Sequence, residues 1–443
     1  MSGTGAGAVL AVAGVTAVYA LGSRRLSSTP VSSALVFTGC GVLLGPAVLG
    51  VVGTGGGAAP ITALLEAALT LVLFTDAMTV RRRDLTRGGF LPRRLLGIGL
   101  LLSIAAGWLL AVPLFPGLTV WELALVGVIL APTDAALGKT AISDPRVPPL
   151  VRQGLNVESG LNDGMVLPFF VVLLAAVPGT SYADEGVAGT FWRSLLLSTA
   201  LGLLAGGVAG RLLQAARSRG WITREWRQVY VLAVAAASYE LAVVTHGSGF
   251  IAAWVAGFAF GHALRNVPTH DPAPDGDGDR DGTADLAEHL GGLLASVSLL
   301  LFGAVLLGPA LRHLTWQTVL YALLSLTVVR LLPVALALLG SGLRAPTVLY
   351  VGWFGPRGLA SVVLGLLVAE EHLAGTETIG RVVAVTVALS VLLHGATAPA
   401  LAGAYGAWYR RAAGWPGTPL REAAPVPEGT GRRRPGRLDG PAP

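Results

Sequence analysis

The stretch LNVESGLNDGMVLPFF, Leu155 to Phe170, carries four polar residues inside an apolar run. At 3.6 residues per turn, Glu158, Ser159, Asn162 and Asp163 fall within about 140° of one another, so a helix here has one polar, acidic side. An ionised carboxylate at bilayer depth costs roughly 3 kcal/mol on insertion scales. If the surrounding chain spans a membrane, this side must therefore face other helices, water or an ion.

The composition around this stretch is that of a membrane protein. Of the 443 residues, 53% are hydrophobic and 13% are charged, and the mean hydropathy is +0.68. Soluble domains have about 25% charged residues. Apolar runs of roughly 18 to 23 residues recur along the chain, which is long enough for each to cross the hydrocarbon core as a helix. The excess of basic residues mostly flanks these runs, which indicates membrane topology and not nucleic-acid binding.

These runs predict an all-α polytopic membrane protein with about thirteen transmembrane helices. Their centres lie near residues 14, 41, 69, 103, 127, 165, 202, 234, 254, 300, 327, 356 and 390. Basic stretches follow the odd-numbered runs, so the positive-inside rule places the N-terminus outside, with its apolar run as a first span and not a removed leader. We expect a transmembrane domain at 1–415, an acidic cytoplasmic loop at 265–289 and a disordered cytoplasmic tail at 416–443.

Two runs contain helix-breaking residues in the middle of the span. They are the fifth, VGVILAPTDAALGKT, and the twelfth, YVGWFGPRGLASVV. Each is the fifth member of its half when the seventh run separates two halves of six, which is the inverted-repeat signature of many secondary transporters. We therefore expect two inverted six-helix repeats with broken helices. The alternative is chance, because Pro and Gly are common in membrane helices.

The polar residues of the fifth and sixth runs offer only oxygen ligands. Asp163, Asn162 and Ser159, with the Thr133 hydroxyl and carbonyl groups freed near Pro132, suit a hard cation. A carboxylate in a low-dielectric interior also binds a proton more readily than one in water. A site that can hold either ion is the minimum part of an exchanger. The alternative is a buried polar network that fixes helix packing.

Two arginines are candidate partners for the buried charge of Glu158. Arg357 follows a Gly-Pro break and is the favoured partner, while Arg330, in LTVVRLLPV, is the second candidate. The single cysteine, Cys40, lies in an apolar segment and offers neither a disulfide framework nor a cysteine metal site.

Seven stretches occur in the order and spacing of a known family. They are ALLEAALTLVLFTDAM, APTDAAL, VESGLNDG, GSGFIAAWVAGFAFG, VVRLLPV, FGPRGLASVV and LLHGATAPAL. Over roughly residues 10 to 405 the chain resembles the monovalent cation:proton antiporters, the NhaP-like sodium/proton exchangers. The Glu-Ser-x-x-Asn-Asp-Gly run and the Gly-x-Arg-Gly turn are the most specific elements.

The resemblance implies roles for the residues of the sixth run. Asp163 would carry the exchanged proton or ion, assisted by Asn162, Ser159 and Thr133. Asn162, in place of a second Asp, resembles the electroneutral branch of the family, in which one proton exchanges for one monovalent ion.

The resemblance also implies a Glu158–Arg357 ion pair. It makes Asp134 the residue of the family's Thr-Asp break and Asp76 an acidic position on the third span. It further implies a homodimer in the inner membrane.

We therefore expect a secondary active antiporter that exchanges protons for a monovalent cation, with Na⁺ favoured, and that needs no cofactor. A K⁺/H⁺ antiporter or K⁺ efflux protein is the alternative within transport. An intramembrane enzyme with Asp163 and Glu158 as general acid and base is a remote alternative, because its polar cluster should lie near a membrane surface and not in mid-span.

The acidic loop contains a second, separate motif. DGDGDRDGTADLAE, from Asp275, has Asp277, Asp279, Asp281 and Glu288 at the first, third, fifth and twelfth positions of the EF-hand pattern, which suits Ca²⁺. A solvated acidic linker explains the composition equally well and is the favoured interpretation.

Overall fold

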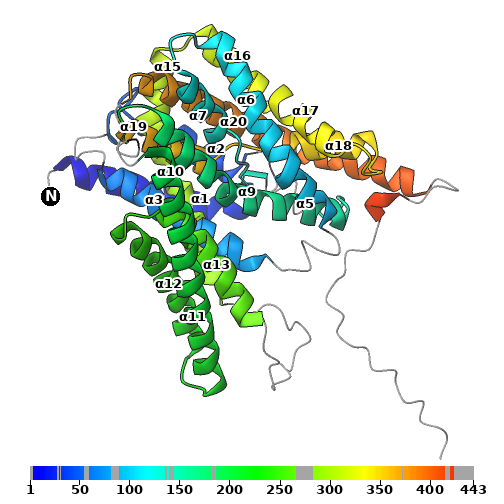
Figure 1. The fold of residues 1–443 in the computed structure, drawn as a ribbon. Coiled ribbons are helices and arrows are strands. Elements are labelled where there is room, and N and C mark those ends of the chain that lie inside the picture. The colour runs from blue at the N-terminus through cyan, green and yellow to red at the C-terminus, as the bar shows by residue number, and fades with distance from the viewer. Residues whose placement is uncertain are drawn as a thin grey trace, which may run out of the picture.

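The computed structural model describes residues 3–26, 29, 31–53, 59–80, 89–134, 137–138, 144–180, 183, 186–265, 283–371, 373–414 and 420–423. Within these ranges the secondary structure is entirely helical (Figure 1). The predicted all-α class is therefore confirmed.

The helices of the N-terminal half run from the first residues to a long helix that contains the polar stretch. They are α1 (Gly3–Leu26), α2 (Ser33–Leu44), α3 (Ala59–Thr79), α5 (Phe90–Arg94), η1 (Leu95–Gly99), α6 (Leu100–Leu114), α7 (Val120–Ile129) and α9 (Pro149–Ala176).

The remaining helices follow in the same continuous way. They are α10 (Gly186–Phe191), η2 (Trp192–Leu197), α11 (Ser198–Ser218), α12 (Arg224–Val244), α13 (Gly249–Arg265), α14 (Asp285–Leu301), η3 (Phe302–Leu307), α15 (Gly308–Arg312), α16 (Trp316–Leu326), α17 (Val328–Ala337), α18 (Ala345–Trp353), α19 (Leu359–Glu370), α20 (Thr376–Ala413) and η4 (Arg421–Ala423).

Eleven of the thirteen predicted centres fall inside a helix; the centre near residue 327 falls between α16 and α17, and the one near residue 356 falls between α18 and α19. Among the described residues, nine helices or continuous helical runs are long and apolar enough to cross a membrane, and α2, α7 and α19 are shorter apolar helices. The count of thirteen spans and the repeat symmetry stay predictions.

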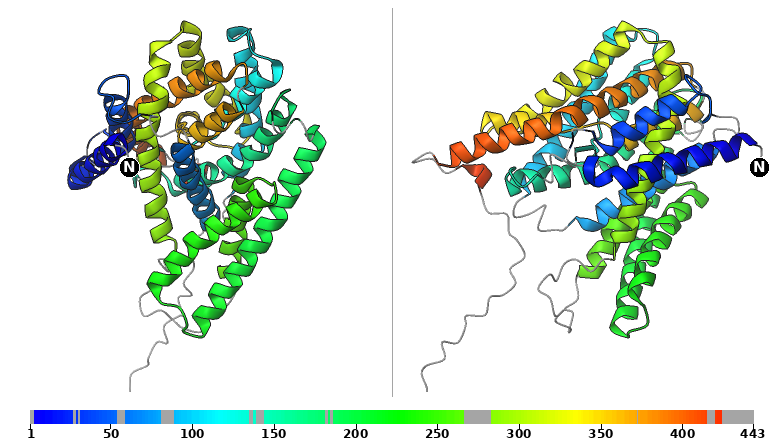
Figure 2. Two further views of the ribbon diagram at one scale, coloured as in Figure 1. Left: turned by 90° about the vertical axis from the view of Figure 1, so that its left-hand side faces the viewer. Right: turned by 180° about the vertical axis from the view of Figure 1, so that it is seen from behind.

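The long helix α9 lies at the centre of the bundle. It contacts α3, α5, α7 and α13. The largest apolar cluster surrounds it and includes Phe37, Leu69, Val126, Phe170 and Val387 from five different helices. Figure 1 and both views of Figure 2 show α11, α12 and α13 projecting together from the rest of the molecule.

Two chain breaks meet beside α9, as the Pro and Gly residues predict. The first follows α7, where residues 132–134 have no regular secondary structure, and the second is the non-helical stretch 354–358 between α18 and α19. The Asp134 backbone N–H donates to the Pro356 carbonyl at 2.8 Å. The Ser361 hydroxyl donates to the Ile129 carbonyl at 2.7 Å. These bonds replace helical ones and hold the two breaks against each other.

A capping box fixes the start of α7, and one of its residues also bonds to the turn between α19 and α20. Thr119 and Glu122 form the box. The second oxygen of Glu122 accepts from the Gly375 N–H at 2.9 Å, just before α20. One buried carboxylate thus stabilises the start of α7 and the turn before α20.

The C-terminal segment differs from the predicted disordered tail at residues 420–423. Glu422 is fully buried and accepts from the Arg344 N–H and the Thr347 hydroxyl, both at 2.8 Å. The Arg421 guanidinium lies 4.4 Å from the centroid of the Phe90 ring. A composition rich in Pro, Gly and Arg hides these four residues, because the contacts that order them are distant in sequence. Residues 416–419 and 424–443 of the predicted tail lie outside the described residues.

Candidate functional site: a carboxylate beside two helix breaks

The polar side of α9 is buried, as a helix among helices requires. Glu158, Ser159, Asn162 and Asp163 are all buried, and Asn162 has no exposed surface, whereas Asp163 keeps 9%. Asp163 is therefore the most accessible of the four side chains. Its Oδ1 atom and Asn162 Oδ1 have no hydrogen-bond partner among the described residues.

Two α9 side chains hold the break that follows α7. The Ser159 hydroxyl donates to the Thr133 carbonyl. Asn162 Nδ2 donates to Thr133 Oγ1 at 2.5 Å and lies 3.4 Å from Glu158 Oε1. Because the amide nitrogen is used in this way, the amide oxygen is left without a hydrogen-bond partner among the described residues. The structure thus brings Thr133, Ser159 and Asn162 together, and Asp163 follows Asn162 on the same helix.

Glu158 pairs with Arg330, and not with Arg357 as the resemblance implied. Arg330 Nη1 and Nη2 lie 3.0 Å from Glu158 Oε1 and Oε2, and both side chains are buried. This bidentate geometry is the strongest arrangement for an Arg–carboxylate pair. The second candidate from the sequence, on α17, is the actual partner of Glu158 in this structure.

Arg357 instead donates hydrogen bonds to backbone carbonyls at both breaks. Its Nη1 atom donates to the carbonyls of Pro132 at 3.3 Å and Gly355 at 3.1 Å. These carbonyls lie just beyond the C-terminal ends of α7 and α18, where helix dipoles leave partial negative charge. Its backbone N–H donates to Ser390 Oγ at 2.6 Å. The cation is therefore partly compensated by two helix ends and not by a bond to Glu158, whereas its Nε and Nη2 atoms have no hydrogen-bond partner among the described residues.

Asp134 lies at the opposite kind of helix end. Its Oδ2 atom accepts from the Leu359 N–H at 3.2 Å, at the N-terminus of α19, where the dipole is positive. A Cβ atom on Gly358 would overlap this carboxylate, so only glycine allows the approach. Asp134 thus caps α19 in this structure, and its predicted role in ion binding stays a prediction.

Asp76 approaches α9 from α3. A Cβ atom built on Gly160 would lie 3.3 Å from Asp76 Cβ and 3.6 Å from Asp76 Oδ2. Asp76 is half-buried. Asp134, Asp76 and Glu158 all lie near enough to Asp163 to act on its charge. Because Arg330 neutralises Glu158, Asp134 and Asp76 are the carboxylates whose charge favours a proton or a cation on Asp163.

Two serines were missed by the sequence reasoning. The Ser361 hydroxyl donates to the Ile129 carbonyl, and the Ser390 hydroxyl accepts from the Arg357 backbone N–H. Ser361 lies within the FGPRGLASVV stretch, so its place next to a break was visible in the sequence. Ser390 lies in a continuous helix and carries no such signal.

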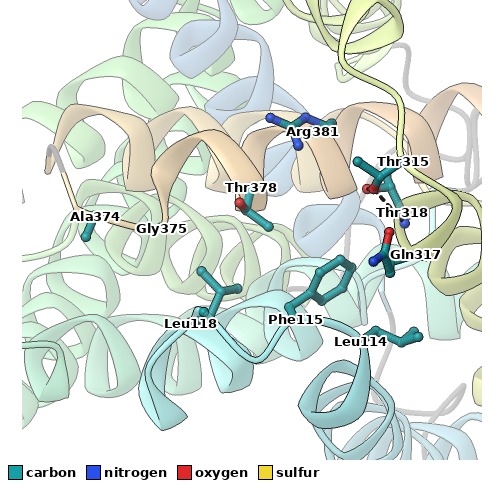
Figure 3. A pocket seen from close by; sticks show the side chains of 11 residues that line it. Leu114, Phe115, Leu118, Thr315, Gln317, Thr318, Ala374, Gly375, Thr378 and Arg381 are labelled. Carbon is teal, nitrogen blue, oxygen red and sulfur yellow. Dashed lines mark hydrogen bonds between the residues drawn. The ribbon is translucent and has the colours of Figure 1, made fainter.

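A polar pocket of about 260 Å³ lies apart from the carboxylate cluster. Its walls come from the α6–α7 connection, the start of α16 and the start of α20, with Phe115, Thr318 and Arg381 among them (Figure 3). None of the predicted site residues lines it. The candidate site is thus defined by buried groups and not by this pocket.

The Ca²⁺ hypothesis concerns residues that are mostly outside the described ranges. Asp277, Asp279 and Asp281 lie there, whereas Glu288 is described and is exposed in the first turn of α14. Within the described residues no group of three or more His, Cys, Asp or Glu could hold a metal ion. Ca²⁺ binding stays a prediction.

An all-helical membrane chain whose two broken helices meet at a buried carboxylate has the architecture of a secondary transporter. The family model for the transmembrane sodium/hydrogen exchangers matches residues 9–403, and the chain belongs to this family.

The named relatives have low sequence identity to this chain, and each is much longer than the region that aligns with it. The K(+)/H(+) antiporter NhaP of Alkalimonas amylolytica is 26% identical over 324 residues, which are 69% of this chain and 52% of that protein. Na(+)/H(+) antiporter 2 of Zygosaccharomyces rouxii is 23% identical over 299 residues, 62% of this chain and 35% of that protein. The chain therefore spans about half or less of the relatives that it matches.

Solved structures show the same fold. The sodium proton antiporter MjNhaP1 from Methanocaldococcus jannaschii at pH 8 is 20% identical, with a TM-score of 0.71 over 90% of this chain and 97% of that chain. An electron-microscopy structure of MjNhaP1 gives a TM-score of 0.72 at 21% identity and the same coverage. The shared fold includes most of both chains.

Proposed function

We propose that this chain is a secondary active antiporter that exchanges protons for a monovalent cation, with Na⁺ as the favoured cation. The observation that carries the proposal is the pair of buried oxygens, Asp163 Oδ1 and Asn162 Oδ1, without a donor among the described residues. Buried acceptors nearly always have a partner. A proton on Asp163, or a dehydrated cation against both oxygens, would supply one.

The proton and the cation compete for one carboxylate, because either of them neutralises the charge of Asp163. An empty, ionised Asp163 is costly in this position, since Asp134 and Asp76 add negative charge nearby and the bilayer interior is a poor solvent for ions. The carrier therefore crosses between its two orientations when it is loaded and seldom when it is empty. This rule couples the outward movement of one ion to the inward movement of the other.

The loaded forms carry equal charge, so exchange of one proton for one monovalent cation is electroneutral. Glu158 contributes no net charge to the site, because Arg330 neutralises it. Asn162, where a second carboxylate would add charge, supports the same stoichiometry.

Alternating access would move α7, α9, α18 and α19 as one bundle against a scaffold. The hydrogen bonds between the two breaks, and from α9 to Thr133, support their movement as a unit. An inner-membrane location and a homodimer rest on the family resemblance alone.

A K⁺/H⁺ antiporter is the second candidate. The bacterial relative reported above bears that name, and side-chain oxygens fit Na⁺, Li⁺ and K⁺ too similarly to decide between them. A K⁺ efflux protein without proton exchange is a further form of this alternative.

The test is cation-dependent collapse of a preset pH gradient in everted membrane vesicles. Salts of Na⁺, Li⁺ and K⁺ are added in turn, with empty-vector vesicles and an Asp163→Asn variant as controls. We expect Na⁺ to collapse the gradient at the lowest concentration. A response to K⁺ alone would favour the second candidate, whereas no response to any cation from inserted protein would refute antiport.

A further inference from the structure

A groove of about 690 Å³ runs between α11 and α13, and none of the predicted site residues lines it. One end is apolar and is lined by Leu203, Leu204 and Phe258. The other end is polar and is lined by Arg211, Gln214 and His262. Small-molecule sites in proteins have volumes of about 300 to 1,000 Å³. The groove is therefore large enough to hold part of a lipid.

The groove lies beside the line of close contact between α11 and α13. Gly202, Gly206 and Gly210 lie on one face of α11 against α13, and a Cβ atom on Gly206 would overlap the Ala256 carbonyl oxygen. Small residues allow such close packing of membrane helices. Gly207, one position further round, has open space at its Cβ position and lines the groove. The surface beside the tight contact is thus left hollow.

The two ends of the groove match the two parts of the bilayer. Arg211 and Gln214 lie near the C-terminal end of α11, where Arg217, Arg219 and Arg224 follow in the chain. The positive-inside rule makes this end cytoplasmic. The apolar residues Leu203 and Leu204 are 54% and 61% exposed and lie toward the membrane interior. A molecule in the groove would have its polar end at the cytoplasmic surface.

Arg211 has the charge that an anionic headgroup needs. It is exposed, and it makes no hydrogen bond or ion pair with any described residue. No acidic residue lines the groove as described. A basic residue near the membrane surface attracts anionic lipid by about 1 kcal/mol.

From these observations we infer that the groove binds an anionic phospholipid of the cytoplasmic leaflet. Arg211 and Gln214 hold the headgroup phosphate, and one acyl chain lies along Gly207 toward Leu203 and Phe258. A lipid fits this groove better than a second copy of the chain, because its polarity is at one end only and its apolar part is concave. The inference does not depend on the antiport activity.

The full-length protein would be purified, and the phosphatidylglycerol and phosphatidylcholine that it retains from equimolar vesicles would be counted by native mass spectrometry. We expect phosphatidylglycerol to be preferred. Arg211→Gln should lower its retention about fivefold by loss of one charge contact. Gly207→Leu should lower retention of both lipids by filling the groove.

Two matched variants control for charge and for added bulk. Arg224→Gln removes a nearby cytoplasmic charge outside the groove, and Gly39→Leu adds the same side chain at another exposed helical glycine with open space. Both should retain lipid like the wild type. Equal retention of the two lipids, or no change in either groove variant, would overturn the inference. So would loss of dimers with Gly207→Leu while lipid retention is unchanged, since that would make the groove an interface between copies.

Discussion

Asp163 and Glu158 lie little more than one helical turn apart, yet only Glu158 has a cationic partner. Arg330 engages both oxygens of Glu158, whereas no described side chain donates to Asp163. Breaking a buried ion pair costs several kcal/mol, so Glu158 should keep Arg330 through the transport cycle. Asp163 is the carboxylate left to change its ligand.

Asp163→Asn should abolish exchange without preventing insertion. The amide has nearly the same shape, but it cannot lose or gain a proton at working pH. Collapse of a pH gradient in everted vesicles measures the activity, and protein content of the membrane fraction measures insertion. Asp144→Asn, which changes a half-buried carboxylate paired with the exposed Arg146, is the matched control and should keep exchange. Exchange by the Asp163 variant above the empty-vesicle background would remove Asp163 from the mechanism.

Glu158 and Arg330 should behave as a coupled pair. Glu158→Gln or Arg330→Ala alone should each destabilise the protein by about 3 kcal/mol or more, because each leaves an unpaired buried charge. The double variant should recover part of this loss. Thermal unfolding of the purified protein measures the coupling.

Arg357→Ala combined with Glu158→Gln provides the comparison. Arg357 donates to backbone carbonyls and not to Glu158, so these two changes should be coupled much more weakly than Glu158 and Arg330. Strong coupling of Glu158 to Arg357 and none to Arg330 would contradict the pairing in the structure.

At the scale of elements, backbone groups that lose their helical hydrogen bonds at one break find partners at the other break. Arg357 compensates the C-terminal ends of α7 and α18, and Asp134 caps the N-terminus of α19. Opposite charges therefore lie at opposite helix ends, as the dipoles require. The breaks are held by charge as well as by packing.

Asp134→Ala should destabilise the protein by about 1 kcal/mol through loss of this cap. Asp134→Asn keeps an oxygen acceptor for the Leu359 N–H and should keep most of the stability. If Asp134 only positions α19, the Asn variant should also keep exchange, whereas the Ala variant should lose part of it. Thermal unfolding and vesicle exchange are both needed. Loss of exchange in a fully stable Asn variant would show that Asp134 binds the ion.

The sequence could predict the breaks but not all of their contacts. Pro132 and Pro356 interrupt apolar runs, and this local signal located both breaks. The composition of α9 likewise located the buried polar side. The choice between Arg330 and Arg357 depends on how α17 packs against α9, which no local pattern contains. Charge and position in the span favoured Arg357, but helix ends that only the folded chain brings together already compensate it in part.

At the scale of the whole molecule, the C-terminal segment joins elements far apart in the chain. Glu422 bonds to the start of α18, and Arg421 reaches Phe90 on α5 and the Ser341 carbonyl. The half-helix α18 leads directly into the break at 354–358. The segment therefore fixes the outer end of an element whose inner end lies beside the site.

A chain that ends at Ala423 should be as stable as the full chain, while one that ends at Gly414 should be less stable. The shorter chain removes the acceptor of the Arg344 N–H and one of the two partners of the buried Thr347 hydroxyl, which keeps Tyr405, so the loss should be about 1 to 3 kcal/mol in total. Glu422→Gln in the full chain should lose less than the shorter truncation, because the amide oxygen can still accept. Thermal unfolding of the four proteins tests this order. Equal stability of the two truncated chains would mean that the docked segment does not contribute.

The charge moved in one transport cycle is a property of the whole molecule, and it can be measured directly. If one proton exchanges for one monovalent cation on Asp163, no net charge crosses the membrane. An imposed potential of about 100 mV would then leave the equilibrium ion gradients of proteoliposomes unchanged. If the site moved one net charge per cycle, the same potential would add about 2.3 kcal/mol and shift the equilibrium ratio about fiftyfold. Potassium gradients with valinomycin can set the potential when Na⁺ is the transported cation. Because Asn162 and the Glu158–Arg330 pair leave Asp163 as the single exchangeable charge of α9, we expect the unchanged ratio.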